Sequence, residues 1–205
     1  MTQPRFISIE GIDGAGKSTH LAAIRARLEA QGAELVMTRE PGGTPLAETL
    51  RAMVLGGQAI NGLSEAMLVF AARHDHVERL IRPALARGAV VLSDRFADSS
   101  FAYQGGGSGV ALETLLQLET MACAGLKPEL TLWFDLDPAE AARRRAAARD
   151  ADRFEAEDLA FFQRVRAAYA ARAMADPARF VRLDASQSID AVGAAVAAAL
   201  EERGW

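Results

Sequence analysis

The chain has little lysine and cysteine, and it lacks long apolar runs. Lys17 and Lys127 are its only lysines among 23 basic residues, so a lysine in a functional motif stands out. Cys123 is its single cysteine, which excludes a disulfide framework within the chain. No apolar stretch is long enough to span a bilayer, and residues 1–6 lead into a strand pattern without signal-peptide features. We therefore expect a cytoplasmic protein without a membrane partner.

The length and the net charge restrict the class of protein further. A chain of 205 residues predicts a single domain, residues 1–205, with room for a lid. Half of the residues are apolar, which is enough to form a full core. The net charge of -4 argues against a nucleic-acid partner, since nucleic-acid binders usually carry a basic surface.

One motif decides most of the functional prediction. Residues 11–18 read G-x-x-x-x-G-K-S, directly after an apolar run and directly before a helical pattern. This strand–loop–helix context is that of a phosphate-binding loop, whose glycines let successive N–H groups point at a phosphate. Lys17 can reach the β- and γ-phosphates, and Ser18 can hold Mg²⁺. A chance glycine-rich turn is the alternative, and the complete motif in the correct frame argues against it.

Asp13 inside this loop needs a separate explanation. A carboxylate would repel the triphosphate of a donor nucleotide. Asp13 is therefore expected to point away from the donor, toward a hydroxyl group of a second substrate.

Five short apolar runs alternate with helical patterns, which predicts an α/β fold with a doubly wound, five-stranded parallel sheet flanked by helices. The runs are continuous, as in strands covered on both faces. They are Phe6–Ile9, Leu35–Thr38, Ala89–Ser93, Leu130–Leu136 and Phe180–Leu183. Helices are predicted to end at Gly32, to begin after the cap residues Ser64 and Asp137, and to run from Asp190 to Leu200.

Two arginines follow strands directly. Arg39 and Arg95 are expected at the carboxyl edge of the sheet, where ligands bind in this architecture. Bidentate guanidinium groups suit a monophosphate dianion. The alternative is structural pairing with Glu40 and Asp94. Asp94 also ends a strand, as a Mg²⁺-side aspartate does in many phosphate-loop enzymes, and is predicted to act directly or through water.

Arginines also gather after the fourth strand. Residues 143–155 contain Arg143, Arg144, Arg145, Arg149 and Arg153. We interpret Arg143 and Arg145 as solvated, and the other three as part of a lid that closes over a triphosphate. His20, His74 and His76 lack the companions of a metal site and are interpreted as surface or packing residues.

Five segments match the pattern of one known family. They are Ile9–Thr19, Thr38–Thr44, Leu68–Arg73, Asp94–Gly106 and Asp152–Glu155. On these segments the chain resembles bacterial thymidylate kinase along nearly its whole length. The phosphate loop is shared by many enzymes, whereas the other four segments are specific to that family. Phe96 departs from the family pattern, which commonly has Tyr or His there.

The resemblance implies specific roles. ATP and Mg²⁺ would be held by Gly11, Ile12, Asp13, Gly14, Ala15, Gly16, Lys17, Ser18, Thr19 and Arg144, with Asp94 on the metal side. dTMP would be held by Asp13, Arg39, Phe70, Arg73, Arg95, Ser100, Tyr103 and Gln104. In this scheme Asp13 lies near the 3′-hydroxyl, Phe70 stacks on thymine and Arg73 reaches its O4. The catalytic set would be Lys17, Arg95, Asp13, Arg149 and Arg153, the last two from the lid. From the sequence alone, an aromatic side chain on an apolar helix face, such as Phe70, is more often a core residue than a platform for a base.

We therefore predict a phosphate-loop kinase that transfers the γ-phosphate of ATP to dTMP, and by resemblance a homodimer. Two alternatives stay open at this point. One is a phosphate-loop kinase for another nucleotide or nucleoside, and the other is a nucleotide-dependent regulatory module.

Overall fold

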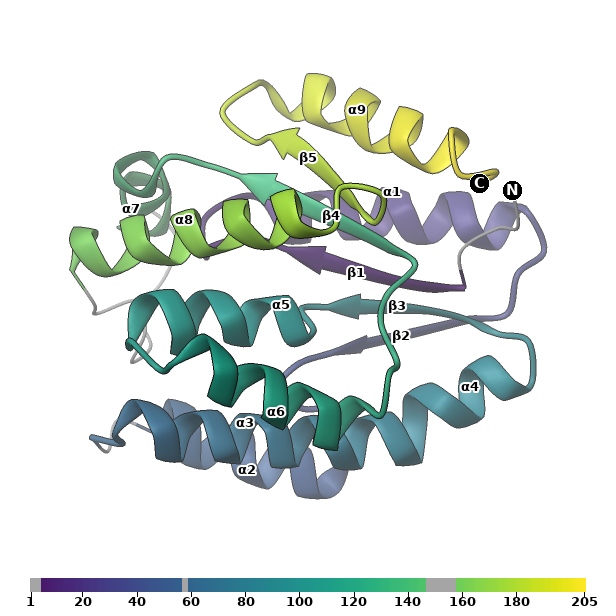
Figure 1. Ribbon diagram of the computed structural model, residues 1–205. Helices are drawn as coiled ribbons and strands as arrows, with labels where there is room; N and C mark the ends of the chain where they lie inside the picture. Colours follow the sequence, from purple (N-terminus) through teal and green to yellow (C-terminus); the bar gives the residue numbers. More distant parts are fainter. Residues whose placement is uncertain (1–4, 57–58, 147–157) are drawn as a thin grey trace.

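A five-stranded parallel sheet forms the centre of the molecule (Figure 1). The computed structural model describes residues 5–56, 59–146 and 158–205. Its strands are β1 (Phe6–Glu10), β2 (Leu35–Arg39), β3 (Val90–Asp94), β4 (Leu130–Asp135) and β5 (Phe180–Asp184), in the order β2-β3-β1-β4-β5. The predicted strands and the doubly wound topology are thus confirmed, with strand bounds that agree within one residue.

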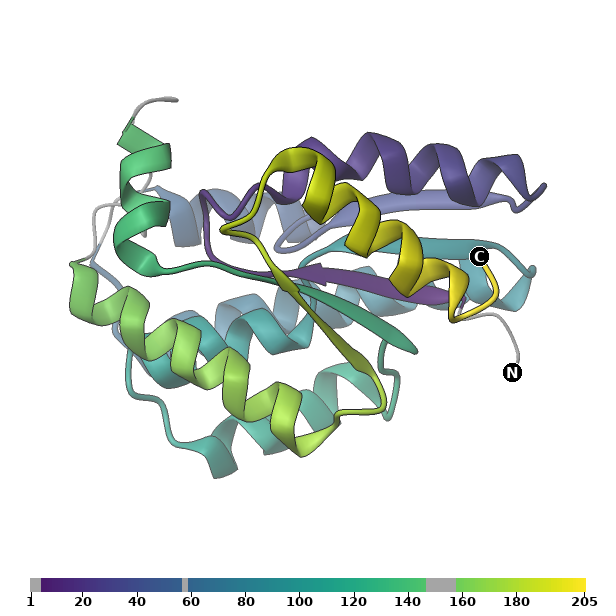
Figure 2. The same cartoon turned by 90° about the horizontal axis from the view of Figure 1, so that it is seen from above.

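Helices connect the strands and cover both faces of the sheet. In Figure 2, α1 and α9 lie together on one face, while α8 lies on the other. The helices are α1 (Lys17–Ala30), α2 (Pro45–Leu55), α3 (Gly62–His76), α4 (Arg82–Ala86), α5 (Ala97–Ser100), α6 (Leu112–Cys123), α7 (Pro138–Ala146), α8 (Leu159–Ala175) and α9 (Ile189–Glu201). Two π-helical segments, η1 (Val77–Ile81) and η2 (Phe101–Gly107), continue α3 and α5. Within the described ranges no helix is both long enough and apolar enough to cross a membrane.

The inner strands β1 and β3 send alternate side chains into two apolar cores. Phe6 and Val91 pack with the α3 and α6 side, whereas Ile7 and Leu92 pack with the α1 side. This follows from the strand geometry, in which successive side chains point to opposite faces. The continuous apolar runs of β1, β3 and β4 therefore report a sheet covered on both sides.

The edge strands correct one expectation. β2 and β5 contain exposed or half-buried positions along their length, so they are not covered on both faces as the apolar runs suggested. Each edge strand has only one neighbour in the sheet, and its outer side is only partly packed.

One predicted helix cap is wrong and one is confirmed. α3 begins at Gly62, and its cap is Asn61, whose side chain accepts a hydrogen bond from the Ser64 backbone N–H at 2.9 Å. Ser64 therefore lies in the first turn of α3. Asp137 does cap α7, where its Oδ1 accepts from the N–H of Ala139 at 2.9 Å. Both caps satisfy N–H groups that the first turn of a helix leaves without partners.

All five strands run in the same direction, so their carboxyl ends meet at one edge of the sheet, on the left in Figure 1. The phosphate loop follows β1 at this edge, and the segments after β2, β3 and β5 lie beside it. Ligands in open α/β sheets bind at such an edge.

Candidate active site

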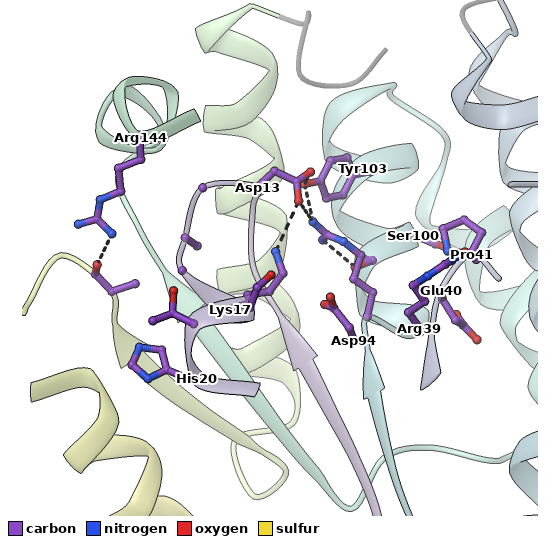
Figure 3. Close-up of a pocket in the computed structure, with 18 of the residues that line it drawn as sticks. Asp13, Lys17, His20, Arg39, Glu40, Pro41, Asp94, Ser100, Tyr103 and Arg144 are labelled. Atoms are coloured by element: carbon purple, nitrogen blue, oxygen red, sulfur yellow. Dashed lines mark hydrogen bonds and ion pairs between the residues drawn. The ribbon is translucent and has the colours of Figure 1, made fainter. Parts of the chain in front are cut away.

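A cavity of about 870 Å³ lies at the carboxyl edge of the sheet (Figure 3). The phosphate loop lies in the middle of its lining, with Arg144 on one side and Arg39 on the other. The lining also includes segments from α2, α3, the end of β3, η2 and the start of α9. A cavity of this size can hold more than one small molecule of nucleotide size.

The phosphate loop depends on glycine at two positions. Gly11 has φ of 138°, and a Cβ atom there would lie 2.4 Å from the carbonyl oxygen of Phe134 on β4. Gly16 has φ of 85° and forms the N-cap of α1, whose first residue is Lys17. The loop therefore presses against the neighbouring strand and then turns directly into a helix N-terminus, which favours anions.

Lys17 lies across this loop with its side chain buried. Its Nζ donates hydrogen bonds to the carbonyl oxygens of Gly11 at 2.9 Å and Ile12 at 3.1 Å. An ammonium group has three N–H donors, so these two bonds leave one donor for a phosphate. Burial, followed by the positive charge of Arg95, lowers the pKa of Lys17. The carboxylates of Asp13 (which lies 3.6 Å from Nζ), Asp94 and Glu10 oppose this shift without cancelling it, and a bound polyphosphate would add further negative charge.

The predicted metal-side residues Ser18 and Asp94 both line the cavity. Asp94 Oδ1 is buried and has no hydrogen-bond partner among the described residues. A buried carboxylate oxygen of this kind is costly unless it gains a ligand. A hydroxyl and a carboxylate are hard oxygen donors that suit Mg²⁺. The described ranges contain no group of three or more His, Cys, Asp or Glu side chains able to hold a metal, so Mg²⁺ would need phosphate oxygens to complete its coordination.

Arg95 and Asp13 form the central ion pair of the site. Arg95 Nη2 lies 2.6 Å from Asp13 Oδ1, and Arg95 Nη1 donates to the carbonyl oxygen of Gly11 at 2.9 Å. Burial alone would lower the pKa of Arg95, but the Asp13 carboxylate together with Tyr103, Tyr169 and Asp94 outweighs burial and holds that pKa well above its ordinary value. Asp13 faces Arg95 and Tyr103 on the side of the cavity away from Arg144 (Figure 3). Asp13 Oδ1 also lies 3.6 Å from Lys17 Nζ. The carboxylate therefore contacts the lysine of the phosphate loop as well, and the expectation that it turns away from donor phosphates stays a prediction.

The backbone of Arg95 has an unusual conformation, with φ of 71°. The Arg95 N–H donates to the Ile9 carbonyl at 2.9 Å, and Ser93 Oγ donates to the Arg95 carbonyl at 2.7 Å. Non-glycine residues in this region carry strain, which gathers at functional sites when surrounding contacts maintain it. With this backbone conformation the Arg95 side chain reaches Gly11 and Asp13 of the phosphate loop.

Arg39 lies at the opposite wall, at the end of β2 and about half exposed. Its Nη2 lies 3.0 Å from Oε2 of Glu48 in α2, and its Nη1 donates to the Pro41 carbonyl at 3.0 Å. The ion-pair partners that the sequence suggested for Arg39 and Arg95 are therefore wrong. Arg39 pairs with Glu48 instead of Glu40, and Arg95 pairs with Asp13 instead of Asp94. Both arginines line the one cavity, as their strand-end positions predicted.

Arg73 also lines the cavity, although it is almost completely buried. Its guanidinium carbon lies 4.5 Å from the centre of the Phe70 ring. Phe70 is 2% exposed, belongs to the apolar core and is absent from the cavity lining. The ring thus lies against Arg73 within the core, and its role as a platform for a base stays a prediction.

Ser100, Gln104 and Tyr103 bring the α5–η2 segment to the cavity wall. Ser100 Oγ accepts from Arg73 Nη2 at 3.0 Å, and Gln104 Nε2 donates to Glu65 at 2.8 Å. The Tyr103 hydroxyl lies 3.3 Å from Arg95 Nη2 and 3.4 Å from Asp13 Oδ2. The acceptor-side residues proposed from the sequence, apart from Phe70, therefore all line the same cavity.

On the other side of the loop, Arg144 lines the cavity and is held by two contacts. Its Nε lies 3.0 Å from Glu140, and its Nη1 donates to the Ala185 carbonyl at 3.0 Å. Arg143 is 74% exposed and contacts only Glu140 among the described residues, which agrees with the solvated role expected for it. Arg149, Arg153 and most of the expected lid segment lie outside the described residues, as does the side chain of Arg145.

Sequence reasoning missed one group of cavity residues. Ala185, Gln187, Ser188 and Val192 follow β5 or begin α9, and they line the cavity near Arg144. The rule that ligands lie beyond the carboxyl ends of strands could have found them, since β5 ends at Asp184. His20 also lines this side; its ring stacks on Phe134 with centroids 5.6 Å apart.

Glu10 and Tyr169 were also missed. Glu10 is fully buried at the end of β1, and its carboxylate accepts from the Phe96 backbone N–H at 2.7 Å and from Ser99 Oγ at 2.6 Å. Tyr169 of α8 donates to the same carboxylate at 3.0 Å, and its hydroxyl lies 3.2 Å from Arg95 Nη1. No pattern in the sequence places a tyrosine of a late helix beside an arginine of the third strand.

Comparison with known proteins identifies the family of the chain. The family model for thymidylate kinase matches residues 9–196, a range that includes the phosphate loop and the cavity-lining residues named above. The chain belongs to the thymidylate kinase family. The thymidylate kinase of Albidiferax ferrireducens is 52% identical, over 100% of this chain and 98% of its own length. The thymidylate kinase of Paraburkholderia xenovorans is 54% identical, over 92% of this chain and 93% of its own length.

A solved thymidylate kinase has the same fold. The crystal structure of thymidylate kinase from Ehrlichia chaffeensis superposes with a TM-score of 0.77 and 32% sequence identity. The superposition covers 96% of this chain and 97% of the Ehrlichia chain. The five-stranded sheet and its flanking helices are therefore those of the thymidylate kinase family.

Proposed function

We propose that the chain transfers the γ-phosphoryl group of ATP to dTMP, giving ADP and dTDP. The observation that carries this proposal is the single cavity in which a phosphate loop lies between Arg144 and the Arg39–Arg95 wall. Such a cavity has room for a donor polyphosphate on one side of Lys17 and for an acceptor monophosphate on the other. Membership of the thymidylate kinase family gives the identity of the two substrates.

The reaction follows from this arrangement as a direct transfer. An oxygen of the dTMP phosphate attacks the γ-phosphorus in line, and the bond from that phosphorus to the bridging oxygen of ADP breaks. The attacking oxygen is already anionic, so the step needs positioning and charge neutralisation more than a strong base. We assign this neutralisation to Lys17 and Arg95, and to Arg149 and Arg153 of the lid segment at about 143–155.

The donor site is assigned to the phosphate loop. The backbone N–H groups of residues 11–19 and the N-terminus of α1 favour the phosphates. Arg144 faces the same space from α7. We place the adenosine part beside residues 185–188 and the first turn of α9, because these complete the lining on that side.

Mg²⁺ is part of this proposal. Thymidylate kinases use ATP and typically Mg²⁺, and the unpartnered Asp94 Oδ1 with Ser18 fits such an ion. When bound, Mg²⁺ neutralises charge on the donor phosphates. Titration of the protein with Mn²⁺ and ADP, followed by electron paramagnetic resonance, tests this assignment, with tighter Mn²⁺ binding expected in the wild type than in Asp94→Asn.

The acceptor site is assigned to the opposite wall. Arg95 and Arg39 would hold the dTMP phosphate, and Asp13 would accept a hydrogen bond from the deoxyribose 3′-hydroxyl. The base would lie against the α3 and η2 residues: Phe70, Arg73, Ser100 and Gln104. The ring of Tyr103 would crowd the 2′ position and so favour deoxyribose.

We also propose that the protein is a cytoplasmic homodimer. Large apolar side chains are exposed on α3 and α6, two helices that pack against each other. They are Leu63, Met67, Leu112, Leu116 and Met121, which are 43–67% exposed. Exposed apolar side chains on two neighbouring helices favour association with another protein surface. Sedimentation equilibrium tests the assembly, and a monomer at micromolar concentration would contradict it.

A substrate screen tests the proposed reaction. Each common nucleoside monophosphate and thymidine is incubated with ATP and Mg²⁺, and the products are identified by mass spectrometry. Conversion of dTMP to dTDP with the highest specificity constant is expected. Preferred use of another nucleotide or a nucleoside would assign a different kinase activity, and ATP hydrolysis without acceptor phosphorylation would indicate a regulatory nucleotide-binding module.

A further inference from the structure

Glu40 lies buried between Arg73 and His76. Its Oε2 lies 2.7 Å from Arg73 Nε, and its Oε1 lies 2.9 Å from His76 Nδ1. The three side chains are 1%, 3% and 0% exposed for Arg73, Glu40 and His76 respectively. The other ring nitrogen of His76 lies 2.7 Å from Thr38 Oγ1. Glu40 is thus fixed at both carboxylate oxygens.

These contacts connect two elements that meet at the cavity. Thr38 and Glu40 come from the end of β2 and the residue after it, and the Glu40 N–H donates to the Asp94 carbonyl at 2.9 Å. Arg73 and His76 lie three residues apart on α3, on neighbouring turns. The carboxylate therefore ties the side chain of Arg73 to the edge of the sheet.

The donors of Arg73 are nearly all in use. Nε donates to Glu40, and Nη2 donates to the Phe96 carbonyl at 3.2 Å and to Ser100 Oγ at 3.0 Å. Nη1 is buried without a hydrogen-bond partner among the described residues. The guanidinium plane is planar and rigid, so the contacts at Nε and Nη2 determine where the two N–H groups of Nη1 point.

The Phe70 and Phe96 rings enclose the same guanidinium, with centroids 4.5 Å and 5.5 Å from its central carbon. These rings provide contact but no direction for the N–H groups. Within the described part of the chain Glu40 is the only carboxylate in an ion pair with Arg73. Burial lowers the pKa of Arg73, but Glu40, with smaller contributions from Cys123 and Glu10, more than offsets burial, so the pKa of Arg73 is raised.

We propose that Glu40, held by His76, is a positioning residue that directs Arg73 Nη1 at the C4 substituent of the acceptor base, and so determines selectivity for a keto over an amino pyrimidine. This inference rests on the proposed function. A C4 carbonyl accepts a hydrogen bond, whereas a C4 amino group presents only donors. A well-aimed buried donor therefore rejects the amino base, because its N–H would meet another donor and remain unpaired.

A structural salt bridge is the competing interpretation. Breaking a buried ion pair generally lowers stability whether or not it serves recognition. The two interpretations differ in what they predict for selectivity. Loss of stability alone affects dTMP and dCMP alike, whereas misdirection of Nη1 changes the ratio between them.

The test is the ratio of kcat/KM for dTMP to that for dCMP in Glu40→Gln, Arg73→Gln and the double variant. Glutamine keeps the length and one acceptor of Glu40 but removes its charge. We expect the ratio to fall roughly 10- to 100-fold in Glu40→Gln, the range for loss of one hydrogen bond to a charged group. Adding Glu40→Gln to Arg73→Gln should change the ratio no further, because Glu40 acts only through Arg73.

Glu48→Gln is the matched control. Glu48 makes the same type of ion pair on the same wall, with Arg39 instead of Arg73. It should change dTMP and dCMP use by the same factor and leave the ratio intact. Should Glu40→Gln fail to fold, Glu40→Asp gives the same readout, since it keeps the charge but cannot reach both Arg73 and His76.

The outcomes are distinct. An unchanged ratio in folded Glu40→Gln with a lower melting temperature would make Glu40 a purely structural residue and overturn the inference. An unchanged ratio in Arg73→Gln would overturn it too, because Arg73 would not read the base. Failure of the wild type to phosphorylate dTMP would instead reject the proposed function itself.

Discussion

Asp13 Oδ1 lies 2.6 Å from Arg95 Nη2, so the carboxylate of the phosphate loop and the arginine after β3 neutralise each other on the acceptor side of the cavity. Both side chains are largely shielded, with 29% and 14% exposure. A phosphate that binds Arg95 must therefore compete with Asp13. The same pair also places Asp13 beside any sugar attached to that phosphate, where the carboxylate can accept a hydrogen bond from a sugar hydroxyl.

Asp13→Asn should separate the competition with phosphate at Arg95 from the recognition of the sugar hydroxyl. The variant frees Arg95 from its carboxylate, so inorganic phosphate should raise the melting temperature more than in the wild type. It also weakens the contact with the 3′-hydroxyl by loss of a charge-assisted hydrogen bond, roughly 10- to 100-fold. The preference for dTMP over its 3′-deoxy analogue should narrow by that factor. A preference that stays at the wild-type value would remove Asp13 from sugar recognition.

Lys17→Ala should leave the fold intact and remove most turnover. Lys17 neutralises charge that shifts during transfer, and loss of one such contact typically costs roughly 3–4 kcal/mol, or about 100- to 1,000-fold in kcat. Lys17→Met is the matched variant, since it keeps most of the buried chain without the charge. Single-turnover kinetics with saturating ATP and dTMP provide the measurement. A folded Lys17→Met protein with near-normal kcat would contradict the phosphate-loop assignment.

Arg95→Ala and Arg153→Ala should differ in the parameter that they change. Arg95 would hold the dTMP phosphate before and during transfer, so its loss should mainly raise the KM for dTMP. Arg153 is expected to contact the transferring group, so its loss should lower kcat more than dTMP affinity. Steady-state kinetics with each substrate varied in turn provide the comparison.

Arg143→Ala is the control for this pair, because Arg143 is exposed and pairs only with Glu140 among the described residues. It should leave both parameters close to the wild type. If Arg153→Ala also leaves kcat unchanged, the lid function belongs to Arg149 or to neither arginine.

The strands and the phosphate loop could be predicted because their signals are local. A continuous apolar run reports burial on both faces, and G-x-x-x-x-G-K-S reports a backbone conformation that only a few sequences adopt. Arg39 and Arg95 could be placed at one cavity because the carboxyl ends of parallel strands share an edge. The family resemblance added the residues of α3 and η2, which no local pattern assigns to a base.

Contacts between distant segments could not be predicted in the same way. Arg39 pairs with Glu48 and Arg95 with Asp13 because α2 and the phosphate loop bring those carboxylates closer than the sequence neighbours. The cap of α3 is Asn61 because its side chain reaches the Ser64 N–H, and both residue types are equally good caps. Such choices depend on packing that a one-dimensional pattern does not contain.

Glu10 is another residue whose contacts come from distant segments of the chain. Its carboxylate accepts three hydrogen bonds, from the Phe96 N–H and from the hydroxyls of Ser99 and Tyr169. Asp98 and Arg95 are the charged groups that act on it most strongly. Burial, followed by the negative charge of Asp98, raises the pKa of Glu10 from an ordinary 4.5 to about 7. Glu10 is therefore partly protonated near neutral pH in the folded protein.

Replacing Glu10 with glutamine should consequently change how stability depends on pH. Below pH 4.5 Glu10 is protonated in both the folded and the unfolded chain, so ionisation costs nothing there. As the pH rises toward 7 and above, the unfolded chain ionises freely while the folded protein must bury the charge, and the wild type loses about 3 kcal/mol of unfolding free energy.

Glu10→Gln lacks this ionisation and keeps acceptor and donor groups for the same partners. Its stability relative to the wild type should therefore increase between pH 5 and pH 8, as measured by urea unfolding at several pH values. The exposed Glu29→Gln serves as the control and should show no such trend. A constant difference between Glu10→Gln and the wild type across this range would mean that Glu10 is ionised throughout, with its three donors outweighing its burial.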